Sequence, residues 1–445
     1  MKKEVLLCCM AGFLLTGITG CSDEEPWTDP NQNESGTTKP DPDEPGTDNP
    51  DEPGTDNPDY ILQKDDIKVD YPETGFTAHV GEPFQVEVKS VSDNKVTYTW
   101  TVNGEEVAQT KSFTHTFMQA GTYQLTLKVS QEQISFEYTY TVNVADAVLP
   151  ETPQNATPYI TKVLEYRPAP GQFVNTMPKY EKGDTQESMN EKVLKTIGNG
   201  VKGMITLGGY GGYVTVGFDH TIRNTPNSID FIVMGNAFEN GSEPGIIQVA
   251  YDVNQNGKPD EEEWFEIAGS AHQNPKQEPW YEQAKQTGNI VETYLDYSIT
   301  YKKPAKEPTT NEEKENYIYW EDNKGHKGYK VMNMFHSQPY YPQWIKENQL
   351  TFTGTCLPQN GINQGTDDSP YFVLPAFSYG YADNQDYNPD NAGIDIDWAV
   401  DKRGNPANLQ GVDFIKIYTG VNQENGWLGE NSTEICGVVD FNLIK

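Results

Sequence analysis

The residues with the clearest chemical pattern lie in the twelve-residue segment 252–263, where oxygen-bearing side chains recur at short intervals. Their spacing matches that of a calcium loop, with glycine where such a loop turns sharply and glutamate where it closes. Calcium prefers several oxygen ligands, and clustered carboxylates repel one another without a cation. The pattern therefore predicts a calcium site, with a polar Asn-Gly turn as the alternative. The predicted ligands are Asp252, Asn254, Asn256, Lys258 through its backbone carbonyl, Asp260 and Glu263.

A second group of carboxylates lies between residues 383 and 397. Their oxygens could ligate another cation, but their spacing matches no metal-binding loop. A solvated acidic loop is the alternative interpretation. The four residues are Asp383, Asp390, Asp395 and Asp397.

Aromatic residues gather in three polar, loop-rich segments of the C-terminal half. Flat aromatic faces beside amides and carboxylates can stack against sugars or heterocycles, so these residues are candidate ligand contacts. Core packing is the alternative, and the alternation at residues 317–320 favours it. The candidates are Trp280, Tyr281, Tyr319, Trp320, His336, Tyr340, Tyr341 and Trp344.

No catalytic residue can be assigned from the sequence. It contains no serine elbow, no zinc-protease helix motif and no Cys/His cluster with zinc spacing. A glycoside hydrolase needs two facing carboxylates, but a chain with 66 acidic residues offers too many pairs to choose one. The net charge of −34 argues against binding to nucleic acid. We expect a non-catalytic protein, with a glycoside hydrolase or a structural adhesin as alternatives.

The elements around the calcium loop resemble strands. Residues 246–251 form an apolar, β-branched run before the loop, and residues 264–267 predict a second strand after it. A helix-loop-helix sensor is not expected here, because there is no helix pair to open. The site is therefore predicted to stiffen a β fold.

The first 59 residues predict a secreted, anchored protein. Lys2 and Lys3 precede an apolar run that is too short to span a bilayer, so residues 1–20 are predicted to be a signal peptide. Ile18-Thr19-Gly20-Cys21 resembles the lipobox of bacterial lipoproteins, which implies cleavage before Cys21 and lipid on its sulfur. Residues 21–59 are acidic and Pro-rich, with the octapeptide at 43–50 repeated at 51–58, and predict an extended tether.

The acidic residues 22–25 resemble the tag that directs Bacteroidota lipoproteins to the outer face of the outer membrane. We therefore expect a protein attached to that membrane by its lipid alone and facing the medium.

Residues 60–146 predict a β-sandwich. Period-two alternation at 96–102 is followed by Asn103-Gly104, a hairpin turn, and by further strands at 121–129 and 136–144. The string from Tyr98 to Tyr123 resembles PKD-like, immunoglobulin-like modules, which implies a spacer.

Residues 147–445 also predict a β-rich fold, a larger sandwich or jelly roll with long loops and few helices, comprising one domain or two. The helix with the clearest pattern is 186–196, and Gly208–Gly212 is predicted to be a tight turn between strands. Cys356 and Cys436 either form a disulfide or remain two thiols. The expected strands are 203–207, 213–218, 229–234, 245–251, 290–300, 350–354, 371–377 and 412–418.

Segments 208–219, 230–238, 397–401 and 413–418 resemble a family of Bacteroidota cell-surface lipoproteins over most of residues 158–445. Such proteins accompany TonB-dependent outer-membrane transporters for corrinoids and glycans. The resemblance implies capture of such a nutrient beside a transporter, without catalytic residues to carry over.

Overall fold

The computed structural model of the protein describes residues 60–90, 96–366, 368–386 and 388–444. The predicted signal peptide, Cys21 and the tether lie outside the described residues. Across these described ranges, no helix is long and apolar enough to cross a membrane.

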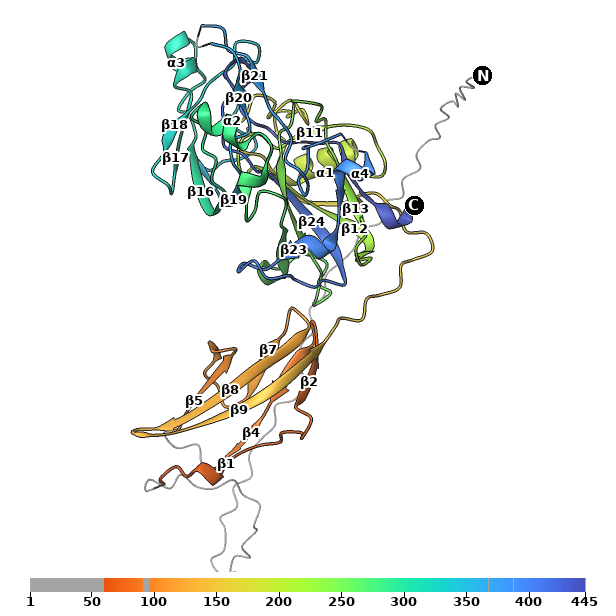
Figure 1. The fold of residues 1–445 in the computed structure, drawn as a ribbon, viewed down its shortest axis with the longest axis vertical. Helices are drawn as coiled ribbons and strands as arrows, with labels where there is room; N and C mark the ends of the chain where they lie inside the picture. The colour runs from red at the N-terminus through yellow and green to blue at the C-terminus, as the bar shows by residue number, and fades with distance from the viewer. Residues whose placement is uncertain (1–59, 91–95, 367, 387, 445) are drawn as a thin grey trace, which may run out of the picture. The chain divides into compact units, whose positions relative to one another are not determined.

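The N-terminal module, residues 60–146, is built from antiparallel hairpins, with one parallel pair between β2 and β9 (Figure 1). Its largest sheet has the strand order β2-β9-β8-β5-β6. Those strands are β2 (Phe76–His79), β5 (Thr97–Val102), β6 (Glu105–Ala108), β8 (Gly121–Gln131) and β9 (Ile134–Ala145). Two further pairs join β1 (Ile67–Val69) to β4 (Val88–Ser90) and β3 (Pro83–Val86) to β7 (Phe113–Thr116), and a short 3-10 turn, η1 (Lys64–Asp66), precedes them.

Trp100 is the centre of this module's core. Its side chain is fully buried, its ring centroid lies 5.0 Å from that of Phe113, and its Nε1 donates a hydrogen bond to the Thr110 carbonyl. The turn after β5 places Asn103 and Gly104 at φ 50° and 86°, as a two-residue hairpin turn requires. The predicted hairpin is therefore confirmed.

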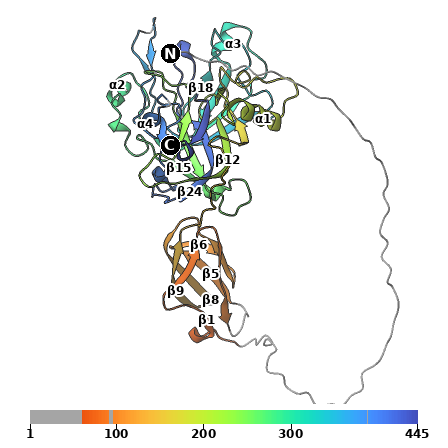
Figure 2. The ribbon, with the colours of Figure 1, turned by 90° about the vertical axis from the view of Figure 1, so that its right-hand side faces the viewer.

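The C-terminal part is organised around a six-stranded antiparallel sheet with the order β10-β12-β24-β14-β15-β23. Figure 2 shows β12, β15 and β24 of this sheet together. Its strands are β10 (Lys162–Arg167), β12 (Tyr213–Arg223), β14 (Gly245–Ala250), β15 (Trp264–Ile267), β23 (Ala399–Val400) and β24 (Gly411–Thr419).

Smaller sheets complete the C-terminal fold. One has the order β18-β17-β16-β19 and another β22-β13-β26, with the pairs β11–β25 and β20–β21 beside them. The bounds are β11 (Ile205–Thr206), β13 (Phe231–Met234), β16 (Tyr294–Lys302), β17 (Ile318–Asp322), β18 (Lys327–Lys330), β19 (Gln349–Cys356), β20 (Ile362–Asn363), β21 (Phe372–Val373), β22 (Gly393–Ile394), β25 (Glu434–Ile435) and β26 (Gly437–Asp440). The helical segments are α1 (Gln186–Ile197), α2 (Tyr281–Gln286), α3 (Asn311–Glu315), α4 (Pro389–Ala392), η2 (Glu261–Glu263), η3 (Pro275–Gln277), η4 (Ile396–Trp398), η5 (Gly426–Leu428) and η6 (Phe441–Leu443).

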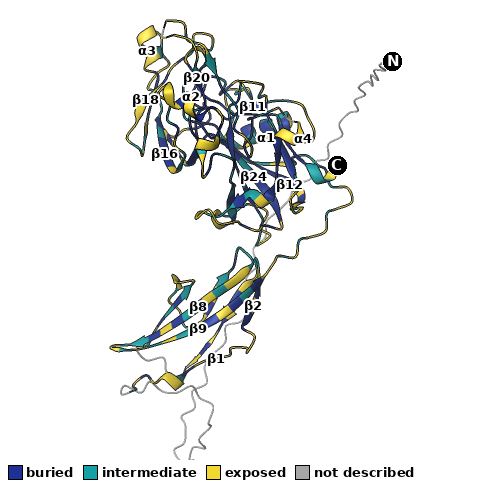
Figure 3. Cartoon of the chain, in the orientation of Figure 1, coloured by how far each residue is buried: buried dark blue, intermediate teal, exposed yellow. Residues whose placement is uncertain are grey.

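The predicted β-rich fold is confirmed. Nearly every residue of β12 and β24 is buried, so both faces of the central sheet are covered, as Figure 3 shows in dark blue. The main departure is the predicted strand 371–377, in which only β21 and an isolated bridge from Leu374 to Gly241 are paired.

The predicted helix at 186–196 is also confirmed. Thr185 caps α1 by accepting a hydrogen bond from the Ser188 amide, and the helix buries Met189, Val193 and Ile197 along one face.

The loop Gly208–Gly212 is a tight turn between strands. Gly208 and Gly211 have φ values of 68° and 84°, and a Cβ at Gly212 would lie 1.9 Å from the Leu207 carbonyl oxygen. Only glycine fits there, and a strand rather than a helix follows.

Cys356 is buried, Cys436 is half-buried, and both are free thiols. No disulfide joins them.

Candidate functional site

A pocket of about 250 Å³ opens in the C-terminal part beside the four-stranded sheet. Aromatic rings form one part of its wall, and amide, carboxylate and imidazole groups form another. This mixture is typical of sites that bind small polar ligands. The lining residues are Ile290, Tyr294, Tyr297, Trp320, Asp322, His326, Cys356, Leu357, Gln359, Asn422, Gln423 and Glu424.

A β-bulge in β16 produces the aromatic wall. Tyr294 pairs with Cys356 and Tyr297 with Gly354, so β16 holds one residue more than β19 between these pairs. In a regular strand, residues three apart point to opposite faces. The extra residue turns both tyrosines to the same side, where their rings stack at a centroid distance of 6.0 Å and an interplanar angle of 13°.

Trp320 reaches the pocket from β17 because its neighbour across the hairpin has no side chain. Gly328 of β18 pairs directly with Trp320, and a Cβ there would lie 3.0 Å from the indole ring. The indole is only half-buried, although it also packs against the main core. It can therefore present a partly open face to a ligand.

Asp322 organises the polar side of the pocket. One of its carboxylate oxygens accepts hydrogen bonds from the backbone amides of Lys324 and His326, which closes the turn between β17 and β18. The other oxygen lies 2.8 Å from the Tyr297 hydroxyl and 2.8 Å from His326 Nδ1. Burial opposes the charge of Asp322, but the hydrogen bonds from Tyr297 and His326 outweigh it and lower the pKa of this carboxyl.

The hydrogen-bond chain continues to the opposite loop. Asn422 donates from Nδ2 to the Tyr297 hydroxyl at 2.9 Å, and its carbonyl accepts from Gln359. Gln423 exchanges two hydrogen bonds with the backbone of Gly361. The loops at 357–361 and 420–424 are thereby tied together behind the pocket.

The remaining titratable groups of the pocket are not arranged for nucleophilic chemistry. Burial raises the pKa of the Cys356 thiol to about 12, so the reactive thiolate is not favoured. Glu424 forms an ion pair of 2.8 Å with the buried Lys330.

The predicted aromatic contacts separate into three groups. Trp320 lines the pocket. Tyr319 instead packs against Tyr329, and His336 packs against Phe173 with ring centroids 4.7 Å apart. The others are at most 7 % exposed and form part of the hydrophobic core, which is the alternative that the sequence left open. These core residues are Trp280, Tyr281, Tyr340, Tyr341 and Trp344.

The predicted calcium loop joins β14 to β15, with η2 at its end. Asp252 accepts hydrogen bonds from the amides of Asn256 and Gly257 at 3.0 and 2.8 Å, which curls the loop around its carboxylate. Gly257 has a φ of 81° with open space where a Cβ would stand. The fold of the loop is therefore compatible with the turn that calcium loops make.

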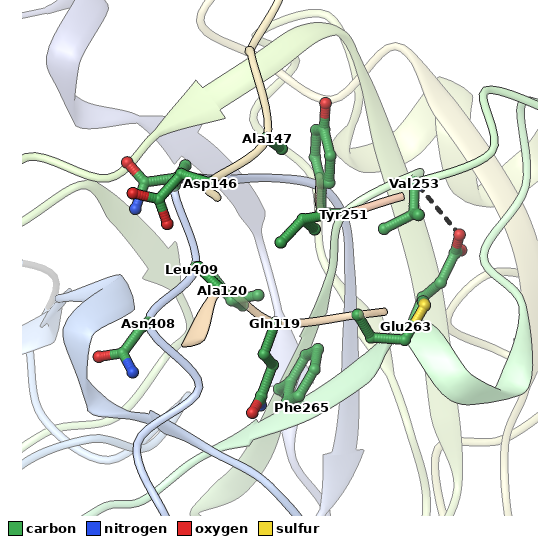
Figure 4. Close-up of a pocket in the computed structure, with 13 residues that line it drawn as sticks. Gln119, Ala120, Asp146, Ala147, Tyr251, Val253, Glu263, Phe265, Asn408 and Leu409 are labelled. Atoms are coloured by element: carbon green, nitrogen blue, oxygen red, sulfur yellow. Dashed lines mark hydrogen bonds between the residues drawn. The ribbon is translucent and has the colours of Figure 1, made fainter. Parts of the chain in front are cut away.

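The side chains of this loop converge on one point. Asn254 and Asn256 both donate from their amide nitrogens to one oxygen of Asp260, at 2.6 and 2.7 Å. Glu263 is 2 % exposed and closes the loop by accepting from the amides of Val253 and Asp260; Figure 4 shows the bond from Val253.

If a cation bound at this point, Asn254 and Asn256 would face it with their side-chain oxygens. Asp260 would then bind the cation in place of their two amide nitrogens. Lys258 takes part through its amide, which donates to the Asn256 side chain at 3.0 Å. Throughout the described ranges, no group of three or more His, Cys, Asp or Glu side chains is placed to hold a metal ion. A calcium ion would therefore depend on amide and backbone oxygens as well as carboxylates.

The second group of acidic residues has divergent partners. Asp383 is buried and accepts from the amides of Asn236, Ala237 and Glu434. Asp395 bonds to the Asp397 amide, whereas the Asp397 side chain bonds to Asn224 and Asn227. Asp390 is exposed in α4. These contacts give Asp383, Asp395 and Asp397 separate structural roles, and the described residues show no group of acidic side chains placed to share a cation.

Sequence reasoning missed most of the pocket. Tyr294 and Tyr297 lie in a predicted strand, but the bulge that brings them together has no simple sequence signal. The acidic turn at 322–326 did have a sequence signal, since an Asp that precedes a Gly-containing turn often accepts hydrogen bonds from backbone amides.

Comparison with protein families gives a match between residues 67–144 and the PKD domain. This match confirms the immunoglobulin-like module predicted in that region. No curated protein matches the chain.

Several solved structures show a weak likeness. A quinonprotein alcohol dehydrogenase-like protein from Bacteroides thetaiotaomicron is 13 % identical over 22 % of this chain, with a TM-score of 0.16, and the chain spans only 23 % of it. A SusE-like protein is 10 % identical over 84 % of this chain and 97 % of its own, with a TM-score of 0.21.

A protein of the Bacteroides ovatus mixed-linkage glucan utilization locus, solved with a mixed-linkage heptasaccharide, is 11 % identical over 85 % of this chain and 99 % of its own, with a TM-score of 0.18. Scores this low carry no argument about this chain.

Proposed function

We propose that this protein is a non-catalytic surface lipoprotein that captures a glycan in the pocket between β16, β17 and the loop at 420–424. The observation that carries the proposal is the stacked pair Tyr294–Tyr297 beside Trp320, with hydrogen-bonding groups on the facing side. Sugars present apolar C–H faces and rims of hydroxyl groups, so they need this combination of flat rings and polar groups.

The size of the pocket favours a glycan over a corrinoid. A volume of about 250 Å³ lies at the small end of ligand pockets, and suits one or two sugar rings better than a large macrocycle.

The chemistry of the pocket supports binding over hydrolysis. A glycosidase needs a protonated carboxylic acid, whose pKa is usually raised by burial. The pKa of Asp322 is lowered instead, since its hydrogen bonds with Tyr297 and His326 outweigh its burial, and Glu424 is paired with Lys330. A glycoside hydrolase remains the alternative, and it would release reducing sugar.

The other parts of the proposal place the pocket in its cellular setting. Lipid on Cys21 would hold the chain on the outer membrane, the tether and the PKD-like module would extend it, and calcium in the 252–263 loop would stiffen the β fold. A TonB-dependent transporter would receive the captured glycan.

Isothermal calorimetry of the chain from Ser22 to Lys445 against a panel of soluble glycans tests the central claim. We expect micromolar to millimolar binding to at least one glycan and no release of reducing sugar. Binding that survives Trp320→Ala and Tyr294→Ala unchanged would move the site elsewhere. Failure to bind any glycan would favour the structural adhesin.

A further inference from the structure

His326 stands at the rim of the pocket with its two ring nitrogens in different environments. Nδ1 lies 2.8 Å from an oxygen of Asp322, and the backbone amide of His326 donates to the other oxygen at 2.7 Å. Two bonds to one carboxylate fix both the position of the residue and the orientation of its ring. For Nε2, the described residues provide no hydrogen-bond partner, and the side chain is 44 % exposed.

The contact with Asp322 determines which ring nitrogen of His326 carries the proton. The Asp322 carboxylate is ionised, because its hydrogen bonds with Tyr297 and His326 outweigh its burial and lower its pKa, so it can only accept hydrogen bonds. Nδ1 must therefore donate. In the neutral ring Nε2 is then left with its lone pair and acts as an acceptor.

We propose that His326 selects the charge of the captured sugar: its Nε2 accepts a hydrogen bond from a hydroxyl of a neutral sugar and disfavours the carboxylate of a uronic acid. This inference rests on the proposed glycan capture and adds a rule for which glycans are captured.

The other charged groups around the ring are already paired within the protein. Lys324 forms an ion pair with Asp296 at 2.6 Å and lies 5.2 Å above the Tyr294 ring, and Lys330 pairs with Glu424. Each ammonium group therefore already has a carboxylate partner. The titratable side chains that line the pocket together with His326 are Asp322, Tyr294, Tyr297, Cys356 and Glu424.

The test uses the chain from Ser22 to Lys445 and two sets of probes. Neutral oligosaccharides from β-glucan, mannan and xylan form one set, and uronate oligosaccharides from alginate and pectate form the other. Calorimetric affinities are measured for both sets at neutral pH. The variants are His326→Gln, His326→Phe and, as a matched control far along the chain, His79→Gln.

We expect neutral probes to bind and uronates to bind more weakly. His326→Gln keeps a side-chain acceptor, so it should retain binding of the neutral probes. His326→Phe should lose neutral binding roughly three- to tenfold, the value of one hydrogen bond. His79→Gln should behave as the parent.

Parent-like binding of the neutral probes by His326→Phe would overturn the inference while glycan capture still holds. Tighter binding of uronates than of neutral probes by the parent would also overturn it. If no probe binds, the proposed glycan capture fails and the rule fails with it.

Discussion

Tyr294 and Tyr297 stack face to face within one strand, although residues at this spacing normally point to opposite faces of a sheet. The bulge between them interrupts the regular hydrogen-bond ladder of β16 and gives the pocket a wall of two stacked rings. Tyr297 is 3 % exposed, so the wall is anchored on its inner side.

Removing the outer rings should weaken capture without unfolding the protein. Tyr294→Ala and Trp320→Ala each delete a half-buried ring, and we expect each to weaken glycan binding by about 1 kcal/mol or more. Tyr329→Ala is a matched control, since Tyr329 is 41 % exposed on the adjacent β18 and does not line the pocket. Calorimetry and thermal melts separate the two effects. Equal losses in Tyr329→Ala would mean that the hairpin had distorted.

Tyr297→Phe should affect both binding and stability. The change keeps the stacked ring but removes the hydroxyl that donates to Asp322 and accepts from Asn422. The half-buried Asn422 amide then lacks this acceptor and Asp322 lacks this donor, so we expect a loss of about 1–2 kcal/mol in the free energy of unfolding. Urea denaturation measures this loss. An unchanged midpoint would show that the chain from Asp322 to Asn422 contributes nothing to the fold.

Calcium removal should lower the melting temperature by several degrees, because the ion stabilises only the folded loop. Asp252→Ala combined with Glu263→Ala should reproduce the effect of chelator and make the melt insensitive to it. Glu262→Ala serves as control, since this exposed glutamate lies in η2 beside Glu263 without a predicted ligand role. Calorimetric titration with calcium reports occupancy directly. An identical melt with and without chelator would contradict the calcium site.

Stability should fall as pH rises from about 5 to about 8. Burial, reinforced by the charge of Asp383, raises the pKa of Glu243 to about 8, and burial raises the pKa of Asp383 to about 7. In the unfolded chain both groups titrate near pH 4. Within this window the folded protein therefore binds more protons than the unfolded chain, and the free energy of unfolding decreases with pH.

Glu243→Gln keeps an oxygen for the Ser432 amide but removes the titration, so its stability should depend less on pH. Glu187→Gln on the exposed side of α1 should keep the parental slope. Urea midpoints at several pH values measure both slopes. A parental slope in Glu243→Gln would exclude Glu243 as a source of the pH dependence.

Reductant should leave the thermal melt of the Ser22–Lys445 chain unchanged, because Cys356 and Cys436 are free thiols. Cys356 should resist alkylation until the protein unfolds, since burial raises its pKa to about 12. Cys436 is half-buried and should react sooner. Mass spectrometry after timed labelling gives both rates, and a disulfide-linked peptide would refute the assignment.

The sequence allowed the strands and the cap of α1 to be predicted, because those depend on local periodicity and capping. Residues 213–218 and 412–418 were expected as strands and form the centre of the largest sheet as β12 and β24. The predicted strand 203–207 is shorter in the structure, where only Ile205 and Thr206 pair, as β11.

The pocket could not be predicted, because it depends on long-range register. Nothing local shows that Asn422 would reach Tyr297, 125 positions away in the chain. Aromatic density identified Trp320 but equally selected Trp280 and Tyr340, whose burial reflects core packing. Pattern alone does not distinguish a buried ring from an open one.

The turn between β17 and β18 carries both Asp322 and His326, and Gly325 at φ 93° lets it reverse in few residues. The polar groups that would discriminate between ligands are thus held on a short hairpin tip, while the stacking wall belongs to the sheet. Relatives could exchange this tip and acquire a new ligand preference without repacking the core. For protein engineers, residues 322–326 are accordingly a natural cassette to randomise when retargeting the scaffold.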